Sequence, residues 1–260
     1  MTELLPQLHV LLRRAVQRRP FVYKAHGMLS LHFDFLATQS EMLCHAPNEL
    51  VVPYTRTMMG FLLFKPDPRR IAAIGLGGGS LPKYCYATLP RSSIIVTEIH
   101  AEVLAMRDLF HIPPDDERFE VRCEDGADFV RTACGCLDVL FVDGFDAGGQ
   151  SQQLCTQAFY DDCNGSLAPD GIAVINLAVE DPNLVSSIAR IRRSFVDAIV
   201  VESEDCTNRI VFAGKDNALR VSFEQLCERL RELEKDHPVG LRDTLQRIRL
   251  EQYEAVSVLR

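Results

Sequence analysis

The stretch Ile71-Ala72-Ala73-Ile74-Gly75-Leu76-Gly77-Gly78-Gly79-Ser80 decides the fold of this chain. Its apolar first half, which contains two β-branched isoleucines, predicts a buried strand that stops in a loop of glycines. Ser80 is a good helix N-cap, and Pro82 suits the first turn of a helix. A helix N-terminus presents free N–H groups and the positive end of the helix dipole. The stretch therefore predicts a strand, a loop that a ligand can approach closely, and a helix.

A second signal follows in the next predicted strand. The spacing G-x-G-x-G from Gly75 to Gly79 is not the full dinucleotide pattern, and it also suits a simple tight turn. Glu98 ends the predicted strand 94–98, and an acid about 20 residues after the first glycine can bind both hydroxyls of a ribose. The pair indicates a nucleoside lying across the carboxyl ends of the first two strands.

Composition and charge exclude several classes of protein. The chain has 260 residues, of which 47% are hydrophobic, and no apolar run reaches the ~18 residues that a membrane span needs. Nine cysteines without metal-finger spacing and the lack of a signal-peptide pattern predict reduced thiols, no metal site and a cytoplasmic location. A net charge of −8 argues against nucleic acid as a partner. We therefore expect a small-molecule substrate, with neither nucleic acid nor membrane as a partner.

From the glycine strand onward, strand and helix patterns alternate, which predicts a mostly parallel sheet in an α/β fold. The two last strand patterns are joined by a short link that permits only antiparallel pairing. This layout resembles the seven-stranded, Rossmann-like sheet of class I S-adenosylmethionine-dependent methyltransferases. The expected strands are 71–75, 94–98, 118–122, 137–142, 171–177, 197–202 and 208–213.

The sequence divides into three parts. Residues 1–58 predict an N-terminal amphipathic helix and a small β-rich appendage, and residues 59–215 the nucleoside-binding catalytic domain. Residues 216–260 predict a helical C-terminal tail, whose last 25 residues we expect to be peripheral. Within these parts, helices are expected at 54–64 and 101–110, and the capping box Ser222-Phe223-Glu224-Gln225 opens a late helix.

Further acids follow the third and fourth strands. Asp125 comes after the third strand, and Asp143 and Asp146 come after the fourth. In an open parallel sheet the ligand crevice lies outside the carboxyl ends of the strands, so these acids should converge with Glu98 and the glycine loop. The alternative for Asp143 and Asp146 is a hydrogen-bonded turn, which Asp-Gly favours.

The run from 71 to 177 resembles the spermidine synthase family, the polyamine aminopropyltransferases. The matching pieces are Ile74-Gly75-Leu76-Gly77-Gly78-Gly79, Glu98-Ile99, Asp125-Gly126, Asp143-x-x-Asp146, Phe159-Tyr160 and Leu167-Ala168-Pro169-Asp170-Gly171. The resemblance implies that Asp143 is the catalytic aspartate and that Asp146 helps to hold the amine substrate. Phe159-Tyr160 is more often packing than chemistry.

The resemblance also implies the binding residues. The nucleoside would be bound by Gly75, Gly77, Gly79, Glu98, Asp125 and Gly126. Gln39 and Tyr54 would line the acceptor pocket, although Tyr54 is equally well a core tyrosine at a helix start. The co-substrate would be decarboxylated S-adenosylmethionine or S-adenosylmethionine itself, and a homodimer is expected because dimers are common in the family.

Two acids at one strand end suit this chemistry. A polyamine is cationic at pH 7, so one carboxylate can hold an ammonium group while the other removes a proton from the attacking nitrogen. Only the neutral amine has a lone pair. Attack on the carbon beside a sulfonium needs little besides alignment and that deprotonation.

The chain departs from the family's pattern at three places. Gly78 stands where the family has an aspartate that grips the amino group of the transferred arm. His100 replaces a usual aspartate, and it could be a base beside the nucleoside or, as we prefer, a cap of the following helix. Thr55-Arg56 replaces a polar or acidic pair, and Arg56 would repel a cation or attract a carboxylate.

Three hypotheses follow. The first is a spermidine synthase-like transferase that moves an aminopropyl group from decarboxylated S-adenosylmethionine to an amine. The second is a methyltransferase on the same scaffold, which uses intact S-adenosylmethionine. The third is a nucleoside-binding module that has lost turnover and acts through protein contacts.

Overall fold

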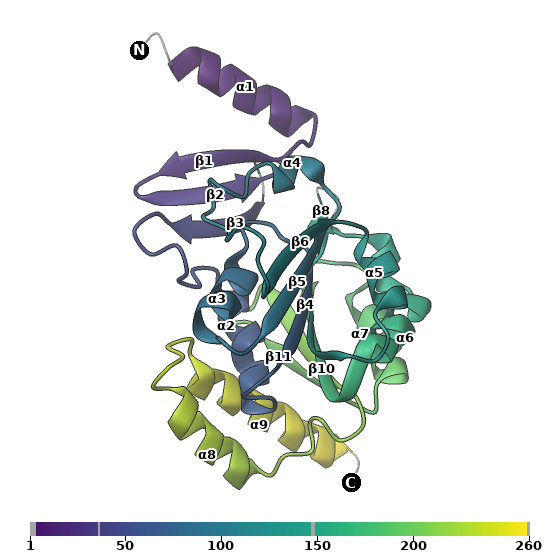
Figure 1. Ribbon diagram of the computed structural model, residues 1–260. Helices are drawn as coiled ribbons and strands as arrows, with labels where there is room; N and C mark the ends of the chain where they lie inside the picture. The colour runs from purple at the N-terminus through teal and green to yellow at the C-terminus, as the bar shows by residue number, and fades with distance from the viewer. Residues whose placement is uncertain (1–3, 36, 147–148, 259–260) are drawn as a thin grey trace.

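A seven-stranded sheet forms the centre of the structure (Figure 1), a computed structural model that describes residues 4–35, 37–146 and 149–258, and side chains of 10–35, 37–145 and 149–251. Its strand order is β11-β12-β10-β7-β4-β5-β6. The neighbouring pairs from β6 to β10 are parallel, whereas β12 runs antiparallel to both β10 and β11. The strands are β4 (Arg70–Ile74), β5 (Ser93–Glu98), β6 (Phe119–Cys123), β7 (Leu137–Val142), β10 (Leu167–Ala178), β11 (Asp197–Glu202) and β12 (Asn208–Gly214).

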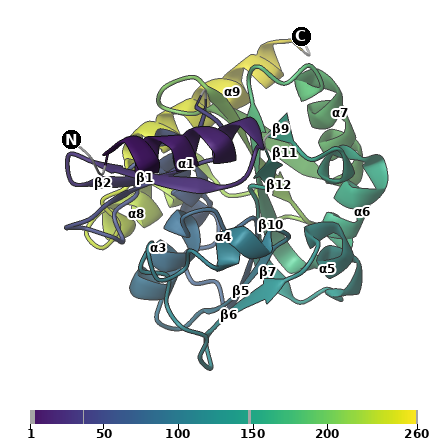
Figure 2. The same ribbon diagram turned by 90° about the horizontal axis from the view of Figure 1, so that it is seen from above.

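Helices cover both faces of this sheet, which explains why its central strands β4, β7 and β10 are largely apolar and buried (Figures 1 and 2). One face packs against α5 (Gly126–Thr132), α6 (Gln157–Ser166) and α7 (Leu184–Ser194). The other packs against α2 (Pro53–Met58), η1 (Met59–Leu63), α3 (Ser80–Thr88), α8 (Phe223–Leu233) and α9 (Leu241–Val258). Consecutive residues of one strand, such as Ala72 and Ala73, therefore point to opposite faces and belong to different hydrophobic cores.

The N-terminal appendage is a separate three-stranded antiparallel sheet with one helix against it (Figure 1). Its elements are α1 (Leu4–Val16), β1 (Phe21–Ala25), β2 (Met28–His32) and β3 (Thr38–Leu43). His26 and Gly27 join β1 to β2, and both have positive φ (51° and 78°), as a two-residue hairpin turn requires. The appendage contributes β3 to the cavity described below.

All seven predicted strands are present, but one predicted helix is mostly absent. Of the expected helix 101–110, only α4 (Ala101–Leu104) forms, and turns follow it. Ile112 N–H turns back to the Arg107 carbonyl at 3.0 Å, which buries Phe110 and Ile112 beneath the glycine loop. The stabilisation gained by burying these two apolar side chains therefore exceeds what a longer helix would provide. The expected helix 54–64 forms as α2 followed by the 3₁₀ helix η1.

The sequence reading missed a small hairpin and misplaced the C-terminal tail. Strands β8 (Phe145–Asp146) and β9 (Gly149–Gln150) pair directly after β7. The last 25 residues, expected to be peripheral, instead bury Leu245 and Ile248 in the main core through α9. The predicted capping box of α8 is present, because Ser222 and Gln225 each accept the other's backbone N–H.

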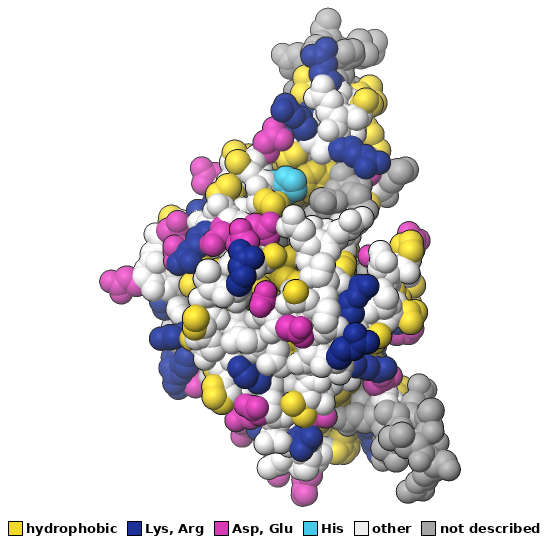
Figure 3. Space-filling model, turned by 90° about the vertical axis from the view of Figure 1, so that its right-hand side faces the viewer, with side chains coloured by type: hydrophobic (Ala, Val, Ile, Leu, Met, Phe, Trp, Pro, Cys, Tyr) yellow, Lys and Arg dark blue, Asp and Glu magenta, His cyan; other side chains and the backbone are white. Residues whose placement is uncertain are grey.

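The surface carries mixed charges. On the face that contains α5 to α7, basic and acidic side chains are interspersed (Figure 3). None of the described helices is both long enough and apolar enough to cross a membrane.

We predict that Ile248→Ala destabilises the protein by about 2–5 kcal/mol, because Ile248 is 0% exposed and its truncation leaves a cavity in the main core. Leu250→Ala is the matched control on the same helix, since Leu250 is 63% exposed and should change stability by less than about 0.5 kcal/mol. Urea unfolding of both variants measures the difference. Equal effects would mean that α9 is not part of the core.

Candidate active site

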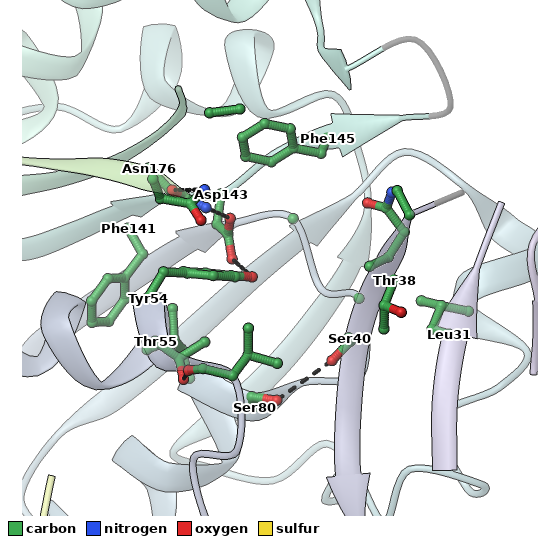
Figure 4. A pocket seen from close by; sticks show the side chains of 18 of the residues that line it. Leu31, Thr38, Ser40, Tyr54, Thr55, Ser80, Phe141, Asp143, Phe145 and Asn176 are labelled. Atoms are coloured by element: carbon green, nitrogen blue, oxygen red, sulfur yellow. Dashed lines mark hydrogen bonds between the residues drawn. The ribbon is translucent and has the colours of Figure 1, made fainter. Parts of the chain in front are cut away.

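A cavity of about 590 Å³ lies at the carboxyl ends of the parallel strands (Figure 4). The glycine loop and the ends of β5 and β7 form its floor, and the appendage closes one side through β2 and β3. The start of α2 and the turn between β11 and β12 form the other side. The cavity therefore joins segments that lie far apart in the sequence.

The glycine loop is pressed against the end of β7. Gly75 has φ +93°, and a Cβ atom at this position would lie 2.3 Å from the carbonyl oxygen of Asp143. The Gly75 N–H also donates to the Thr97 carbonyl at 2.9 Å. Only glycine permits this conformation and this approach, so the loop and Asp143 are fixed relative to each other. Gly75 and Gly77 line the cavity, whereas Gly79 is the N-cap of α3 and is not part of the lining.

Gly78 of the glycine loop is closely surrounded by the side chains of Ser40 and Phe110. A Cβ atom there would lie 2.5 Å from Ser40 Oγ and 2.9 Å from Phe110 Cδ1. The aspartate of the family's pattern would therefore need Ser40 and Phe110 to move. Ser40 Oγ instead lies 3.5 Å from Ser80 Oγ, and both serines line the cavity (Figure 4).

Glu98 is held in a fixed orientation inside the cavity. It is 7% exposed, and its two carboxylate oxygens accept the backbone N–H groups of Leu76 at 3.0 Å and His100 at 2.8 Å. Each oxygen keeps a further lone pair for a ligand hydroxyl. The glycine loop and the acid after it thus form one hydrogen-bonded unit.

The carboxylate of Asp143 accepts hydrogen bonds from two neutral donors, one on each oxygen (Figure 4). Tyr54 Oη donates to Oδ2 at 3.0 Å, and Asn176 Nδ2 donates to Oδ1 at 2.8 Å. Burial raises the pKa of Asp143, and the two hydrogen bonds lower it in part. Burial, helped by the neighbouring charge of Asp143, raises the pKa of Tyr54 well above its usual value, so Tyr54 stays a phenol donor.

The structure does not bring every predicted residue into the cavity. Asp125 is the N-cap of α5 and accepts the Ala127 N–H at 2.8 Å, and neither Asp125 nor Gly126 is part of the lining. A Cβ atom on Gly126 would lie 2.3 Å from Ile74 Cγ2, which gives this glycine a packing reason. Gln39 lines the cavity as predicted. Asp146 belongs to β8, but its side chain lies outside the described residues.

The other departures from the family's pattern have structural explanations. Arg56 does not line the cavity, because its guanidinium pairs with Glu204 and donates to the carbonyls of Leu50 and Val51. It therefore neither repels nor attracts a ligand charge there. His100 occupies the N-cap position of α4, but its side chain makes no cap hydrogen bond and its ring packs on Phe33 at 5.4 Å. His100 is thus at the cap position that we prefer, although its side chain does not form the cap.

Two asparagines at the site were missed from the sequence. Asn176 is 1% exposed within the otherwise apolar strand β10, and Asn208 begins β12. Asn208 Nδ2 donates to Asn176 Oδ1 at 2.8 Å. A lone amide near the carboxyl end of a buried strand was the available signal, because a buried polar group needs a partner.

No metal site is found in the described part of the chain, where no group of three His, Cys, Asp or Glu side chains could hold an ion. Phe159 and Tyr160 are buried at the start of α6 and pack, as expected.

The sheet order, the glycine loop and the acid after the next strand define a nucleoside-binding transferase of the class I S-adenosylmethionine-dependent fold. Residues 51–200 match the spermine/spermidine synthase domain, and the chain belongs to this family.

Similar proteins support this assignment. The chain is 36% identical over 227 residues to a polyamine aminopropyltransferase of Chromobacterium violaceum, covering 85% of this chain and 87% of that protein. A probable spermidine synthase structure from Corynebacterium glutamicum has a TM-score of 0.68 at 18% identity, over 81% of this chain and 83% of the other. Human methyltransferase-like protein 13, solved in complex with SAH, has a TM-score of 0.62 at 24% identity, over 75% and 93%.

The predicted family, α/β fold and transferase class are therefore confirmed. The same comparisons support aminopropyl transfer as the activity, whereas the methyltransferase likeness fits only the alternative. The individual site residues stay predictions.

We predict that Gly75→Ala is much more destabilising than Gly27→Ala. Both glycines have positive φ, so both substitutions cost about 1–2 kcal/mol of backbone strain. The methyl group at 75 also meets the Asp143 carbonyl, whereas nothing lies within 4 Å of a methyl at 27. Thermal unfolding of the two variants measures the difference, and similar melting temperatures would show that the loop can move away from β7.

Proposed function

We propose that this chain transfers an aminopropyl group from decarboxylated S-adenosylmethionine to an amine, with Asp143 as the general base. The observation that carries the proposal is the position of its carboxylate. Asp143 lies between the nucleoside side of the cavity, marked by Glu98 and the glycine loop, and the acceptor side, marked by Tyr54.

On the nucleoside side, Glu98 would accept the two ribose hydroxyls. Its orientation is already fixed by the N–H groups of Leu76 and His100, so binding needs little reorganisation. Gly75 and Gly77 would let the nucleoside lie close to the backbone. The proposed adenine contact of Asp125 and Gly126 would require the ligand to extend beyond the cavity lining.

On the acceptor side, Asp143 would take a proton from the acceptor ammonium and leave its nitrogen with a lone pair. The nitrogen then attacks the methylene carbon next to the sulfonium. A carbon–nitrogen bond forms, the carbon–sulfur bond breaks, and its electron pair neutralises the sulfur to give methylthioadenosine. The proton leaves through Asp143 to solvent. Tyr54 would hold the carboxylate during the transfer. Gln39, which lines the cavity, would form part of the acceptor pocket, and Asp146 would help to hold the amine, as the family's pattern implies.

Methyl transfer from intact S-adenosylmethionine is the second candidate. The observation in its favour is the crowding at Gly78, which leaves no acid on the loop to pair with an aminopropyl ammonium. The cavity offers the neutral hydroxyls of Ser40 and Ser80 there instead.

Incubation with each donor and a linear diamine separates the candidates by mass spectrometry of the nucleoside product. We expect methylthioadenosine from decarboxylated S-adenosylmethionine. S-adenosylhomocysteine from the intact donor would favour the methyltransferase, and the absence of both products would favour a binding module.

We further propose a cytoplasmic homodimer that needs no metal and has no nucleic-acid partner, on sequence and family likeness alone.

We predict that Asp143→Asn lowers turnover by about a thousandfold, because an amide cannot accept the proton. Binding of methylthioadenosine should change little, since Glu98 and the glycine loop carry it. Steady-state kinetics and calorimetric titration measure the two effects on the same preparation. An equal loss of binding would make Asp143 a nucleoside-binding residue instead of a base.

A further inference from the structure

The hydrogen bonds around Asp143 continue outward through two asparagines to the rim of the cavity. Asn176 donates to Asp143 Oδ1, and Asn208 donates to Asn176 Oδ1, each at 2.8 Å. The Thr207 hydroxyl donates to Asn208 Oδ1, also at 2.8 Å. Each amide thus turns its NH₂ group inward and its carbonyl outward, so that a chain of donors ends on the carboxylate.

The sheet places these groups in a row on neighbouring strands. Val142 of β7 is opposite Ile175 of β10, so Asp143 and Asn176 follow side by side. In the antiparallel pair, Asn176 is opposite Ile210 and Ala178 is opposite Asn208. Asn176 and Asn208 are therefore diagonal neighbours on one face. Because β12 runs antiparallel to β10, it begins at the edge where the parallel strands end.

The charge of Asp143 sets the direction of these hydrogen bonds. An ionised carboxylate only accepts hydrogen bonds, so Asn176 must present its NH₂ group to it. The Asn176 carbonyl then faces Asn208, which must also turn its NH₂ group inward. Asn176 is 1% exposed, so water cannot replace either partner. A proton on Asp143 would favour the reversed orientation of both amides.

We propose that Asn176 and Asn208 form an amide relay that keeps Asp143 ionised and aimed at the acceptor, with Asn208 as a positioning residue that acts through Asn176. The inference rests on the proposed role of Asp143 as the base. It extends the site to Asn208, which reaches Asp143 only through Asn176, and to Thr207 at the cavity rim.

The other groups near Asp143 do not account for the same effect. Tyr54 of α2 donates to the second carboxylate oxygen, which leaves Oδ1 to Asn176. The described titratable side chains that line the cavity without a hydrogen bond to Asp143 are Glu98, Glu180, Asp205 and Cys206. The two asparagine amides do not titrate. Their orientation can therefore be read from the pH at which the Asp143 carboxylate becomes protonated.

The test is the titration of the Asp143 carboxyl by ¹³C NMR, in protein labelled at the aspartate side-chain carboxyls, with its signal identified by Asp143→Asn. Asn176→Leu removes the donor and should raise the midpoint by about one pH unit. Asn208→Asp should raise it by a comparable amount, because an acid at 208 accepts from Asn176 and turns the Asn176 carbonyl toward Asp143. The measurement needs no turnover.

A double-mutant cycle separates the relay from the new charge at 208. In the Asn176→Leu background, Asn208→Asp acts only through space, so its shift should be clearly smaller than in the parent. Asn164→Asp is the matched control, since Asn164 is a half-buried amide that donates to the Ser194 carbonyl and does not line the cavity. It should leave the midpoint unchanged. Asn208→Leu adds no charge and should give a smaller shift in the same direction.

Kinetics provide the second reading. The acidic limb of kcat should move to higher pH in both single variants, with recovery at alkaline pH, whereas a merely structural role would lower kcat equally at every pH. An unchanged midpoint in Asn208→Asp, or an equal shift in both backgrounds, would overturn the relay. If the wild-type protein forms no methylthioadenosine, the proposed function fails, and the NMR midpoints still decide the relay.

Discussion

The burial of one carboxylate constrains the whole site. Asp143 lies where burial favours its neutral form, yet the proposed role as a base requires the ionised form. Each of its two carboxylate oxygens accepts a hydrogen bond from a neutral donor, Tyr54 of α2 or Asn176 of β10. A neutral donor stabilises the anion without adding a positive charge that would repel a cationic acceptor. The electrostatics of the cavity therefore remain suited to an amine.

The same residue links the two halves of the cavity. Its carboxylate binds Tyr54 on the proposed acceptor side, while its backbone carbonyl packs against Gly75 of the glycine loop. The loop in turn fixes Glu98 through the Leu76 N–H. In the proposed binding mode, backbone contacts would therefore fix the position of a nucleoside on Glu98 relative to Asp143, and such contacts are less variable than contacts between flexible side chains. This explains why the loop needs glycine at position 75, where a Cβ atom would meet the Asp143 carbonyl oxygen.

The parts of the fold that could be predicted are those with local signals. Alternating apolar strands, the glycine loop and the capping box at Ser222 are encoded in neighbouring residues, and they are present. The predicted helix 101–110 was wrong beyond Leu104, because Phe110 and the following Ile112 pack under the glycine loop. The burial of α9 was missed for a similar reason, since no neighbouring residue in the sequence indicates that α9 packs against β11 and η1.

The site shows the same division between local and distant signals. Glu98, Asp143 and Tyr54 were predictable because they match a family pattern or stand at strand ends, whereas Asn208 depends on the pairing of β12 with β10. Arg56 is the opposite case, an apparent functional departure whose charge is neutralised by Glu204, more than a hundred residues away in the sequence. The same contact ties α2, which carries Tyr54, to the segment before β12, which carries Asn208. The ion pair thus joins the two segments that carry Tyr54 and Asn208. Arg56, whose charge alone would repel an amine, therefore helps to hold the groups around Asp143.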